Sequence, residues 1–376
     1  MRAREIGIAI GHAATGTHNA ITDVAGVRVG HTTLIEGDGP LVVGSGPVRT
    51  GVTVVVPHER VGQALLFAGC HRLNGNGELT GLEWVRESGL LTSPIAITNT
   101  HSVGVVRDAI VAAAARDADP RSVWWSLPVV GETWDGTLND VNGQHVRAKH
   151  VDQALASASA GPVAEGNVGG GTGMICHGFK GGIGTASRVV PDSAGGYTVG
   201  VLVQANYGRR ERLTVSGVPV GTAIATSEVP LPSPRSTPWD WPDSDAAGSI
   251  IVIVATDAPL LPHQCQRLAQ RAGLGLARAG GGGEHSSGDI FIAFSSGNAD
   301  VPAHPGDLGP ARTAAVEMLS DDYVTPLYYA VIEATEEAIL NALLQAETMT
   351  GRDGNTAHRL DPDRLVGIMR GYRTNV

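Results

Sequence analysis

The sequence predicts an α/β (α+β) protein built in layers, with sheets packed between helices. Two kinds of segment predict it. Short apolar, β-branched runs typical of buried strands occupy 51–57, 93–100, 196–206 and 249–257. Apolar residues at helical spacing occupy 105–116, 261–278 and 327–347. No internal repeat is present, so a repeat architecture is excluded.

The run SIIVIVATD is the most strand-like segment of the chain. It begins at Ser249, and four β-branched residues follow directly at 250–253. Because both strand faces carry apolar side chains, we expect a strand buried on both faces. The helix at 261–278 has Pro262 near its start, where a proline is well tolerated.

The longest expected helix, at 327–347, follows Pro326. Its apolar stripe contains Ile332, Ile339, Leu343 and Ala346, with acidic residues on the opposite side. This is the pattern of a helix with one buried face and one solvent-facing face.

The composition narrows the class of protein. Glycine accounts for 51 of 376 residues, nearly twice the average of about 7%. The 27 basic and 37 acidic residues leave a net charge of −10, which argues against a nucleic-acid partner or an anionic membrane surface. The hydrophobic fraction of 42% is sufficient for a core. We expect a compact, soluble protein.

Cysteine usage and the N-terminus favour the cytoplasm. Cys70, Cys176 and Cys265 are far apart and form no CxxC pair, so we expect neither a disulfide framework nor a structural zinc site. The first residues lack an apolar stretch of signal-peptide length, and no run of 18 apolar residues occurs.

Three local patterns are interpreted as structural. The glycine-rich run GNVGGGTGM at 166–174 is better explained by turns and close backbone packing than by phosphate binding, since the residues that follow do not continue a nucleotide-binding signature. Thirteen histidines include no HExxH motif, so no metal is predicted. Ser102 lacks the first glycine of a nucleophile elbow and is interpreted as a turn serine.

One stretch interrupts an otherwise continuous domain over 1–376. Residues 227–248 contain five prolines, which remove backbone donors and exclude a central strand or helix there. This tether leads directly from Gly248 into the expected buried strand at Ser249.

The junction between Gly248 and Ser249 suggests a mechanism. A serine hydroxyl needs a nearby base, and an N-terminal serine carries its own, an α-amine with a pKa of about 7.7–8. The chain would have to be cut before residue 249 to create that amine. Glycine would leave the scissile carbonyl uncrowded and can adopt strained backbone angles. A Gly-Ser pair entering a strand is also ordinary, and the residues alone favour that simpler interpretation.

Several blocks of sequence resemble one family. They are REIGIAIGH with HNAITDVAGVRVGHTTL, GETWDGTLNDVNG (131–143), EGNVGGGTGM, VLVQANYG (201–208), AAGSIIVIVATDAPL (246–260) and HSSGDIFIAFS (285–295). The chain is similar to the L-aminopeptidase/D-amidase–esterase family of self-processing N-terminal-serine hydrolases, which includes the β-aminopeptidases. The likeness extends from residue 5 to about residue 345.

The resemblance implies a fold and a processing event. The fold is a four-layer α-β-β-α sandwich that resembles N-terminal-nucleophile hydrolases with different connectivity. Cleavage would divide the precursor into a 1–248 α chain and a 249–376 β chain that stay associated. The family suggests a homotetramer of such heterodimers, and no cofactor.

The resemblance also implies roles for individual residues. Ser249 occupies the position of the nucleophile, and Asn206 that of the oxyanion donor. Ser287 and Asp289, in HSSGD, match the serine and acid placed beside the nucleophile. On an extended segment the spacing i, i+2 lets both face one side. Without the resemblance, these residues are ordinary strand-end and turn residues.

Two residues of the GETWDG block are expected to bind substrate. Glu132 matches the acid that holds the free amino group of the substrate, and on its own would be a solvated loop glutamate. Trp134 departs from the tyrosine expected near this position in some relatives. An indole donates one hydrogen bond but cannot act as a phenolic acid, so we expect Trp134 only to wall the pocket.

Three functions follow from these observations. The first is release of N-terminal amino acids from small peptides, amino-acid amides and esters through an acyl-enzyme on Ser249. The second is acyl transfer of the ornithine-acetyltransferase type, or hydrolysis of a pantetheine-type amide. The third is a non-catalytic binding protein. Serine at 249, where the acetyltransferases use threonine, and the acid at Glu132 favour hydrolysis.

Overall fold

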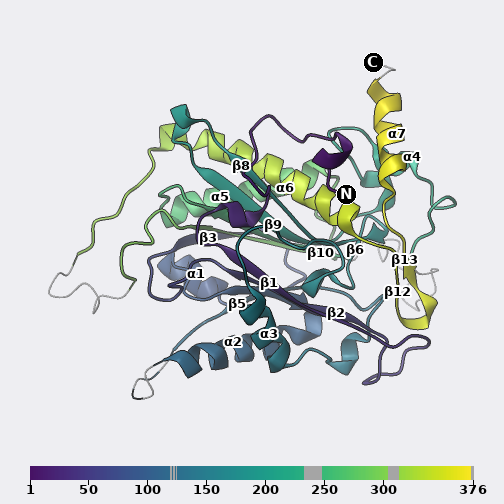
Figure 1. Ribbon diagram of the computed structural model, residues 1–376, viewed down its shortest axis with the longest axis horizontal. Helices are drawn as coiled ribbons and strands as arrows, with labels where there is room; N and C mark the ends of the chain where they lie inside the picture. Colours follow the sequence, from purple (N-terminus) through teal and green to yellow (C-terminus); the bar gives the residue numbers. More distant parts are fainter. Residues whose placement is uncertain (119–120, 122, 124, 233–247, 304–312, 374–376) are drawn as a thin grey trace.

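The strands of the computed structural model form two sheets that lie face to face (Figure 1). The structure describes residues 1–118, 121, 123, 125–232, 248–303 and 313–373. In order across the larger sheet, the strands are β3 (Phe67–Arg72), β11 (Gly288–Ser295), β10 (Ser249–Thr256), β9 (Thr198–Asn206) and β8 (Gly182–Val189). The smaller sheet has the order β1 (Arg28–Glu36), β2 (Val48–Val56), β4 (Ile95–Asn99) and β5 (Val129–Thr133).

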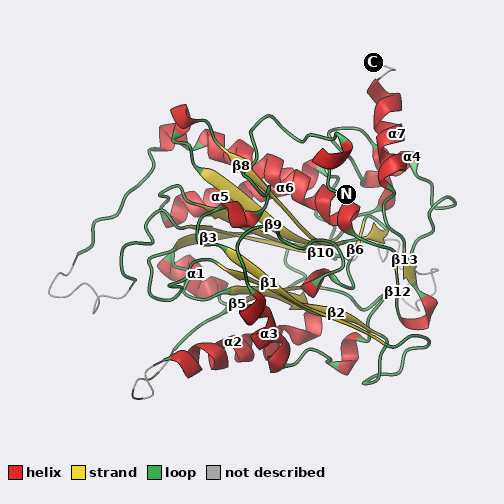
Figure 2. Cartoon of the chain, in the orientation of Figure 1, coloured by secondary structure: helices red, strands yellow, loops and turns green. Residues whose placement is uncertain are grey.

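Helices cover the outer face of each sheet (Figure 2). In the described part of the chain the helices are α1 (Leu82–Ser88), α2 (Val103–Asp117), α3 (Ala148–Ser157), α4 (Val220–Ala223), α5 (Pro262–Arg278), α6 (Thr325–Gln345) and α7 (Pro362–Arg373). Helices α5 and α6 pack on the five-stranded sheet, and α2 and α3 pack on the four-stranded sheet. The layers are therefore α-β-β-α, as the resemblance to the family implied.

Two short hairpins complete the described strands. They are β6 (Ile175–Cys176) with β7 (Phe179–Lys180), and β12 (Met349–Thr350) with β13 (Thr356–Ala357). The first hairpin lies beside the end of β9 (Figure 1).

Three apolar cores separate the four layers. The core between the two sheets contains Ile251 and Ile253 of β10 together with Ile97 of β4. The alternate residues of β10, Ile250 and Val252, pack instead against α5 and α6. Because successive side chains of a strand point to opposite faces, one strand contributes to both cores.

Strand β10 is buried along its whole length. All eight of its residues are buried, and it pairs antiparallel with β9 and parallel with β11. The expected strand, buried on both faces and starting at Ser249, is confirmed. The expected strand at 196–206 and helix at 261–278 also match β9 and α5 within two residues at each end.

Helix α6 differs from its sequence pattern. Its apolar stripe is buried as expected, but Glu333, Glu336 and Glu337 on the other side are buried too. Arg188 of β8 bonds both Glu333 and Glu337, and the N-terminal segment adds Arg4 against Glu337. The expectation of a solvent-facing acidic side is therefore wrong, since other segments of the chain cover it.

Among the described helices, none combines the length and the apolar character needed to cross a bilayer. The three cysteines are free and buried.

Candidate active site

Ser249 is the first residue of β10 and lies where three strand ends meet. Its register partners are Asn206, the last residue of β9, and Gly288, the first residue of β11. The Gly288 N–H donates to Ser249 Oγ, with 3.1 Å between nitrogen and oxygen. Ser249 shares its strand face with Ile251 and Ile253, so its hydroxyl points into the space between the sheets.

The side-chain amide of Asn206 is held in one orientation by two neighbours. The Ile175 N–H donates to Asn206 Oδ1 at 2.7 Å, and Asn206 Nδ2 donates to the Trp134 carbonyl at 2.9 Å. Because an N–H can only donate and a carbonyl can only accept, both contacts require the same orientation. Nδ2 carries two N–H bonds, and the second is left for an acceptor beside Ser249.

Ser287 and Asp289 form a buried pair just before and within the start of β11. Ser287 Oγ donates to Asp289 Oδ1 at 2.7 Å, which confirms that the two side chains face one side. Burial raises the pKa of Asp289 to about 6, while hydrogen bonds from Ser287 and the Ile250 backbone oppose the rise. Ile250 follows Ser249 directly and is the register partner of Asp289, so the Asp289 carboxyl group lies at the start of β10.

Glu132 lies in β5 and is only 2% exposed. Its Oε1 accepts a hydrogen bond from the Glu78 N–H at 2.9 Å, and its Oε2 accepts one from the Thr100 hydroxyl. Burial raises the pKa of the carboxyl group. Both donors are neutral, and no ion pair to Glu132 forms within the described residues. The expectation of a solvated glutamate, which the residues alone suggested, is wrong.

Gly77 lies between Glu132 and Gly288, the residue that bonds Ser249. A Cβ on Gly77 would lie 3.0 Å from Glu132 Oε1 and 3.1 Å from the Gly288 Cα. The distance from Glu132 Oε1 to the Gly288 Cα is therefore no greater than the sum of these two distances. Gly288 is the residue whose N–H donates to Ser249 Oγ. Any side chain at position 77 would fill the space between them.

Trp134 lies at the exposed side of the site. It is 42% exposed, and its ring meets the edge of the His101 ring at 5.7 Å between centroids, with 83° between the planes. Its backbone carbonyl, by contrast, accepts the Asn206 amide described above. The residue thus contributes to the site through a backbone atom that no sequence pattern identifies.

Gly248 precedes the serine in an extended approach to β10. A Cβ at this position would lie 2.1 Å from the Asn206 carbonyl oxygen and 2.9 Å from the Tyr207 Cα. Position 248 therefore accepts only glycine, for lack of space. Residues 233–247 of the expected tether lie outside the described residues.

The glycine-rich run at 166–174 packs between the sheets, as expected. A Cβ on Gly170 would lie 2.2 Å from Gln204 Oε1, and one on Gly171 would lie 2.4 Å from the Ile183 nitrogen. Gln204 itself donates from Nε2 to Thr133 Oγ1 at 2.8 Å, which ties β9 to β5 across the interior. Close backbone approach explains these glycines.

Sequence reasoning missed two polar groups that support the site. Thr100, which follows β4, donates a hydrogen bond from its hydroxyl to Glu132. Lys180 is 0% exposed and binds the glycine-rich run, although no motif contains it. A buried lysine leaves no signal in sequence spacing.

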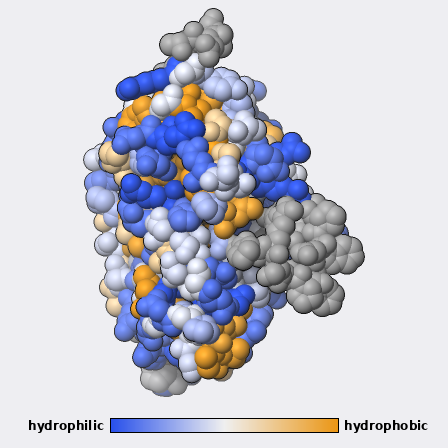
Figure 3. All heavy atoms as spheres, turned by 90° about the vertical axis from the view of Figure 1, so that its right-hand side faces the viewer, coloured by the Kyte–Doolittle hydropathy of each residue, from blue (hydrophilic) through white to orange (hydrophobic). Residues whose placement is uncertain are grey.

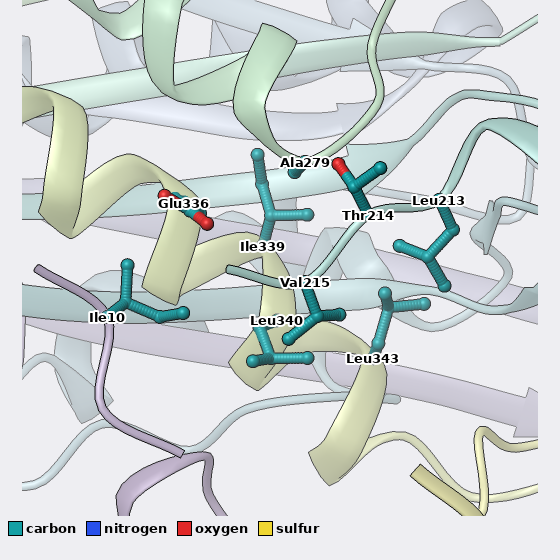
Figure 4. A pocket seen from close by; sticks show the side chains of 9 residues that line it. All are labelled: Ile10, Leu213, Thr214, Val215, Ala279, Glu336, Ile339, Leu340 and Leu343. Carbon is teal, nitrogen blue, oxygen red and sulfur yellow. The ribbon is translucent and has the colours of Figure 1, made fainter. Parts of the chain in front are cut away.

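A small pocket and a larger groove lie beyond the residues described above. One is a small pocket between α6 and residues 213–215, lined mostly by apolar side chains such as Ile339 and Leu343 (Figure 4). The other is a groove of about 420 Å³ lined by Arg72, Arg86 and the segment 77–84. Gly77 borders both this groove and Glu132, so the groove adjoins the site.

Burial affects the titration of two histidines, His31 and His177. Burial lowers the pKa of His31 and of His177 to about 4 in each case. Within the ranges that the structure describes, no three His, Cys, Asp or Glu side chains are grouped as metal ligands would be.

Known proteins resemble this chain over nearly all of its length. Residues 19–357 match the model of peptidase family S58. The β-peptidyl aminopeptidase BapA of Sphingosinicella microcystinivorans is 49% identical, with 99% of this chain and 92% of the relative covered. An uncharacterised aminopeptidase of Mycobacterium tuberculosis is 29% identical, with 89% and 96% covered.

Two solved structures have the same fold. A Burkholderia sp. β-aminopeptidase superposes with a TM-score of 0.89 at 55% identity, covering 99% of both chains. The L-aminopeptidase D-Ala-esterase/amidase of Ochrobactrum anthropi, described as a variant of the Ntn hydrolase fold, superposes with a TM-score of 0.85 at 42% identity and the same coverage.

Proposed function

This chain belongs to peptidase family S58, and we propose that it is a self-processing aminopeptidase whose nucleophile is Ser249. The protein is a hydrolase of the aminopeptidase and amidase class. The observation that supports this assignment of the nucleophile is the meeting of Ser249, Asn206 and Gly288 at three strand ends. Their register is the one that an oxyanion donor at Asn206 beside the Ser249 hydroxyl would need.

The first reaction of the chain is its own cleavage. Ser249 Oγ attacks the Gly248 carbonyl carbon, and the hydroxyl proton passes to the Ser249 nitrogen as the C–N bond breaks. An ester thereby replaces the amide. Water then hydrolyses the ester, which leaves a Gly248 carboxyl group and a Ser249 with both a free hydroxyl and a free amine. The crowding around Gly248 supports this step, since a larger residue could not occupy the scissile position.

After cleavage, the α-amine of Ser249 serves as the base for its own hydroxyl. The Asp289 carboxyl group lies at the start of β10, and the carboxylate and hydroxyl oxygens of the Ser287–Asp289 pair orient the amine. The free N–H of Asn206 stabilises the negative oxygen of the tetrahedral intermediate, an interaction typically worth about 10²–10³ in rate. The acyl group passes to Ser249 Oγ and then to water.

The substrates are small peptides and amino-acid amides or esters with a free amino group. Glu132 receives the ammonium of the substrate, because it is a buried carboxylate held only by neutral donors and lies near Ser249. Trp134 walls the entrance.

The two chains stay together after the cut. Strands β3, β8 and β9 belong to the α chain, whereas β10 and β11 belong to the β chain. In the sheet order β10 and β11 lie between β3 and β9, so each keeps a hydrogen-bonded neighbour from the other chain.

The assembly we propose is a tetramer of these heterodimers in the cytoplasm. Exposed apolar side chains are available for contacts between copies, among them Ile35, Val42 and Val43 around the turn between β1 and β2. On the face shown in Figure 3, hydrophobic side chains gather in separate patches between hydrophilic ones.

Cleavage is tested by the mass of the denatured protein. The purified parent should give two pieces, of residues 1–248 and 249–376, whereas Ser249→Ala should remain one chain. As a control, Ser295→Ala removes another buried hydroxyl from the same sheet and should still be cut. A Ser249→Ala protein that is cut before residue 249 would show that another group performs the cleavage.

Activity separates hydrolysis from acyl transfer. The processed enzyme should release p-nitroaniline from alanine p-nitroanilide and should form no acylated ornithine when ornithine is added. Accumulation of the acylated amine at the expense of free alanine would instead favour the transferase.

A further inference from the structure

The peptide bond between Met174 and Ile175 links a buried ammonium to the Asn206 amide. Its N–H, on Ile175, donates to Asn206 Oδ1 at 2.7 Å. Its carbonyl, on Met174, accepts from Lys180 Nζ at 2.8 Å and from the Gly181 N–H at 2.8 Å. One peptide unit therefore has the lysine on its acceptor side and the catalytic amide on its donor side.

Lys180 is built into this position rather than solvated. Its side chain is 0% exposed, and Nζ also donates to the carbonyls of Gly171 at 3.2 Å and Gly181 at 2.8 Å. These carbonyls and that of Met174 make three acceptors, which match the three N–H bonds of an ammonium. A neutral amine has two N–H bonds and could donate to only two of these three carbonyls.

The surroundings of Lys180 have opposing effects on the pKa of its ammonium group. Burial lowers the pKa of its ammonium to about 7, and electrostatic attraction to the side chains of Cys176 and Asp135 opposes this. The three Nζ contacts fit the protonated form, because only an ammonium has three N–H bonds to donate.

We propose that Lys180 is a positioning residue for the oxyanion donor, acting through the Met174–Ile175 peptide on Asn206. An ammonium on the carbonyl oxygen draws electron density from the peptide and makes its N–H a stronger donor. That N–H holds Asn206 Oδ1, which strengthens the Nδ2 hydrogens in turn and keeps them directed at the developing oxyanion. This also accounts for the glycine-rich run, whose carbonyls at 171 and 174 can both face one buried cation.

The inference rests on the oxyanion role proposed above for Asn206. Lys180 makes no contact with substrate in this scheme, so its removal should lower kcat and leave KM nearly unchanged. The effect should be smaller than that of removing Asn206 itself, since the amide remains in place but loses its support.

The decisive test is a double-mutant cycle on the processed fraction of the enzyme. Lys180→Met should lower kcat for alanine p-nitroanilide by about tenfold with KM changed by less than about twofold, and Asn206→Ala should lower kcat by about 10²-fold or more. The double variant should be no slower than Asn206→Ala alone, because two residues that act through one donor are not additive. Lys180→Gln, which restores two N–H donors without charge, should fall between Lys180→Met and the parent.

Arg210→Met is the matched control. Arg210 is a second buried cation, and it bonds the carbonyls of His177 and Gly178 in the same β6–β7 hairpin. It does not bond the Met174–Ile175 peptide, so its removal should lower the melting temperature and leave kcat within about twofold of the parent.

Each outcome decides the inference. Multiplying losses in the double variant, a parent-like kcat in Lys180→Met, or failure of both Lys180 variants to fold would overturn it and leave a purely structural lysine. A parent-like kcat in Asn206→Ala would overturn the proposed oxyanion role itself, which distinguishes the two failures.

Discussion

The buried carboxylates of α6 and those of the candidate site differ in their partners. On α6, Glu337 is 0% exposed and bonds Arg188 at 2.7 Å and Arg4 at 3.0 Å. In the active site, Glu132 and Asp289 are equally buried but accept hydrogen bonds only from hydroxyls and backbone N–H groups. The α6 acids are neutralised within the fold, and the site acids are not.

The difference in partners suggests different roles for the α6 carboxylates and the site carboxylates. A buried carboxylate without a cation is costly, which is why burial raises the pKa of both Glu132 and Asp289. In the proposed mechanism each would receive a cation: Glu132 the ammonium of the substrate, and Asp289 the α-ammonium of a cut Ser249. Within the described residues, neither carboxylate has a cation as its hydrogen-bond partner.

The largest expected effect is a loss of folding stability when the acids of α6 lose their shared arginine. Arg188→Met should destabilise the protein by about 3–5 kcal/mol, because it leaves Glu333 and Glu337 buried without their shared cation. Urea denaturation would measure the loss. As a control, Arg359→Met removes an exposed partner of Glu347 and should change stability by less than about 1 kcal/mol. A fall in kcat with unchanged stability would contradict the structural role of this group.

The next effect is on substrate recognition. Removing a charge-assisted hydrogen bond to an ammonium costs about 1.5–3 kcal/mol. Glu132→Gln should therefore lower kcat/KM for alanine p-nitroanilide by about ten- to a hundredfold. The parent should hydrolyse the N-acetylated substrate poorly, and the variant should lose the preference for the free amine.

Glu78→Gln provides the control for Glu132. It removes a neighbouring exposed charge but keeps the backbone N–H that bonds Glu132, so kcat/KM should change little. Equal rates of the parent on blocked and free substrates would exclude recognition of the amine.

The smallest effect is a pH dependence of stability in the uncut chain. Because the pKa of Asp289 is raised from 3.8 to about 6, the folded state favours the neutral acid. The stability contributed by that acid is complete below its ordinary pKa and is lost as the pH rises through about 6. In the Ser249→Ala background, Asp289→Asn removes this titration.

Thermal melts of the two uncut proteins would measure this difference. From about pH 4 to about pH 7, the Tm of Ser249→Ala should fall relative to that of Ser249→Ala/Asp289→Asn, by about 2–4 °C for each kcal/mol involved. A difference between the two that stays constant with pH would show that Asp289 does not titrate in this range.

The central strand and α5 were predictable from local signals, whereas the order of the four layers was implied by the resemblance to the family. The β-branched run after Ser249 is typical of a buried strand, and α5 has an apolar stripe. The acids of α6 were misinterpreted for the opposite reason. Their burial depends on Arg188 and on the N-terminal segment, which are distant in sequence, and spacing within one helix contains no information about them.

The site was predictable only in part. The residues that match the family blocks, among them Ser249, Asn206 and Glu132, lie near one another in the fold as expected. Their supports were not predictable, because the Trp134 carbonyl and the Gly288 N–H are backbone atoms that every residue has. Lys180 is recognisable only once its burial is known.

The position of β10 and β11 between β3 and β9 has a consequence for how the enzyme comes into being. The strands of the two proposed chains alternate in blocks across one sheet. If the Ser249 hydroxyl attacks the Gly248 carbonyl with the help of Asn206 and Gly288, cleavage follows only once β9 and β11 have paired with β10. Cleavage before residue 249 would then act as a checkpoint on assembly, because a misfolded chain would keep the nitrogen of its serine in the peptide bond.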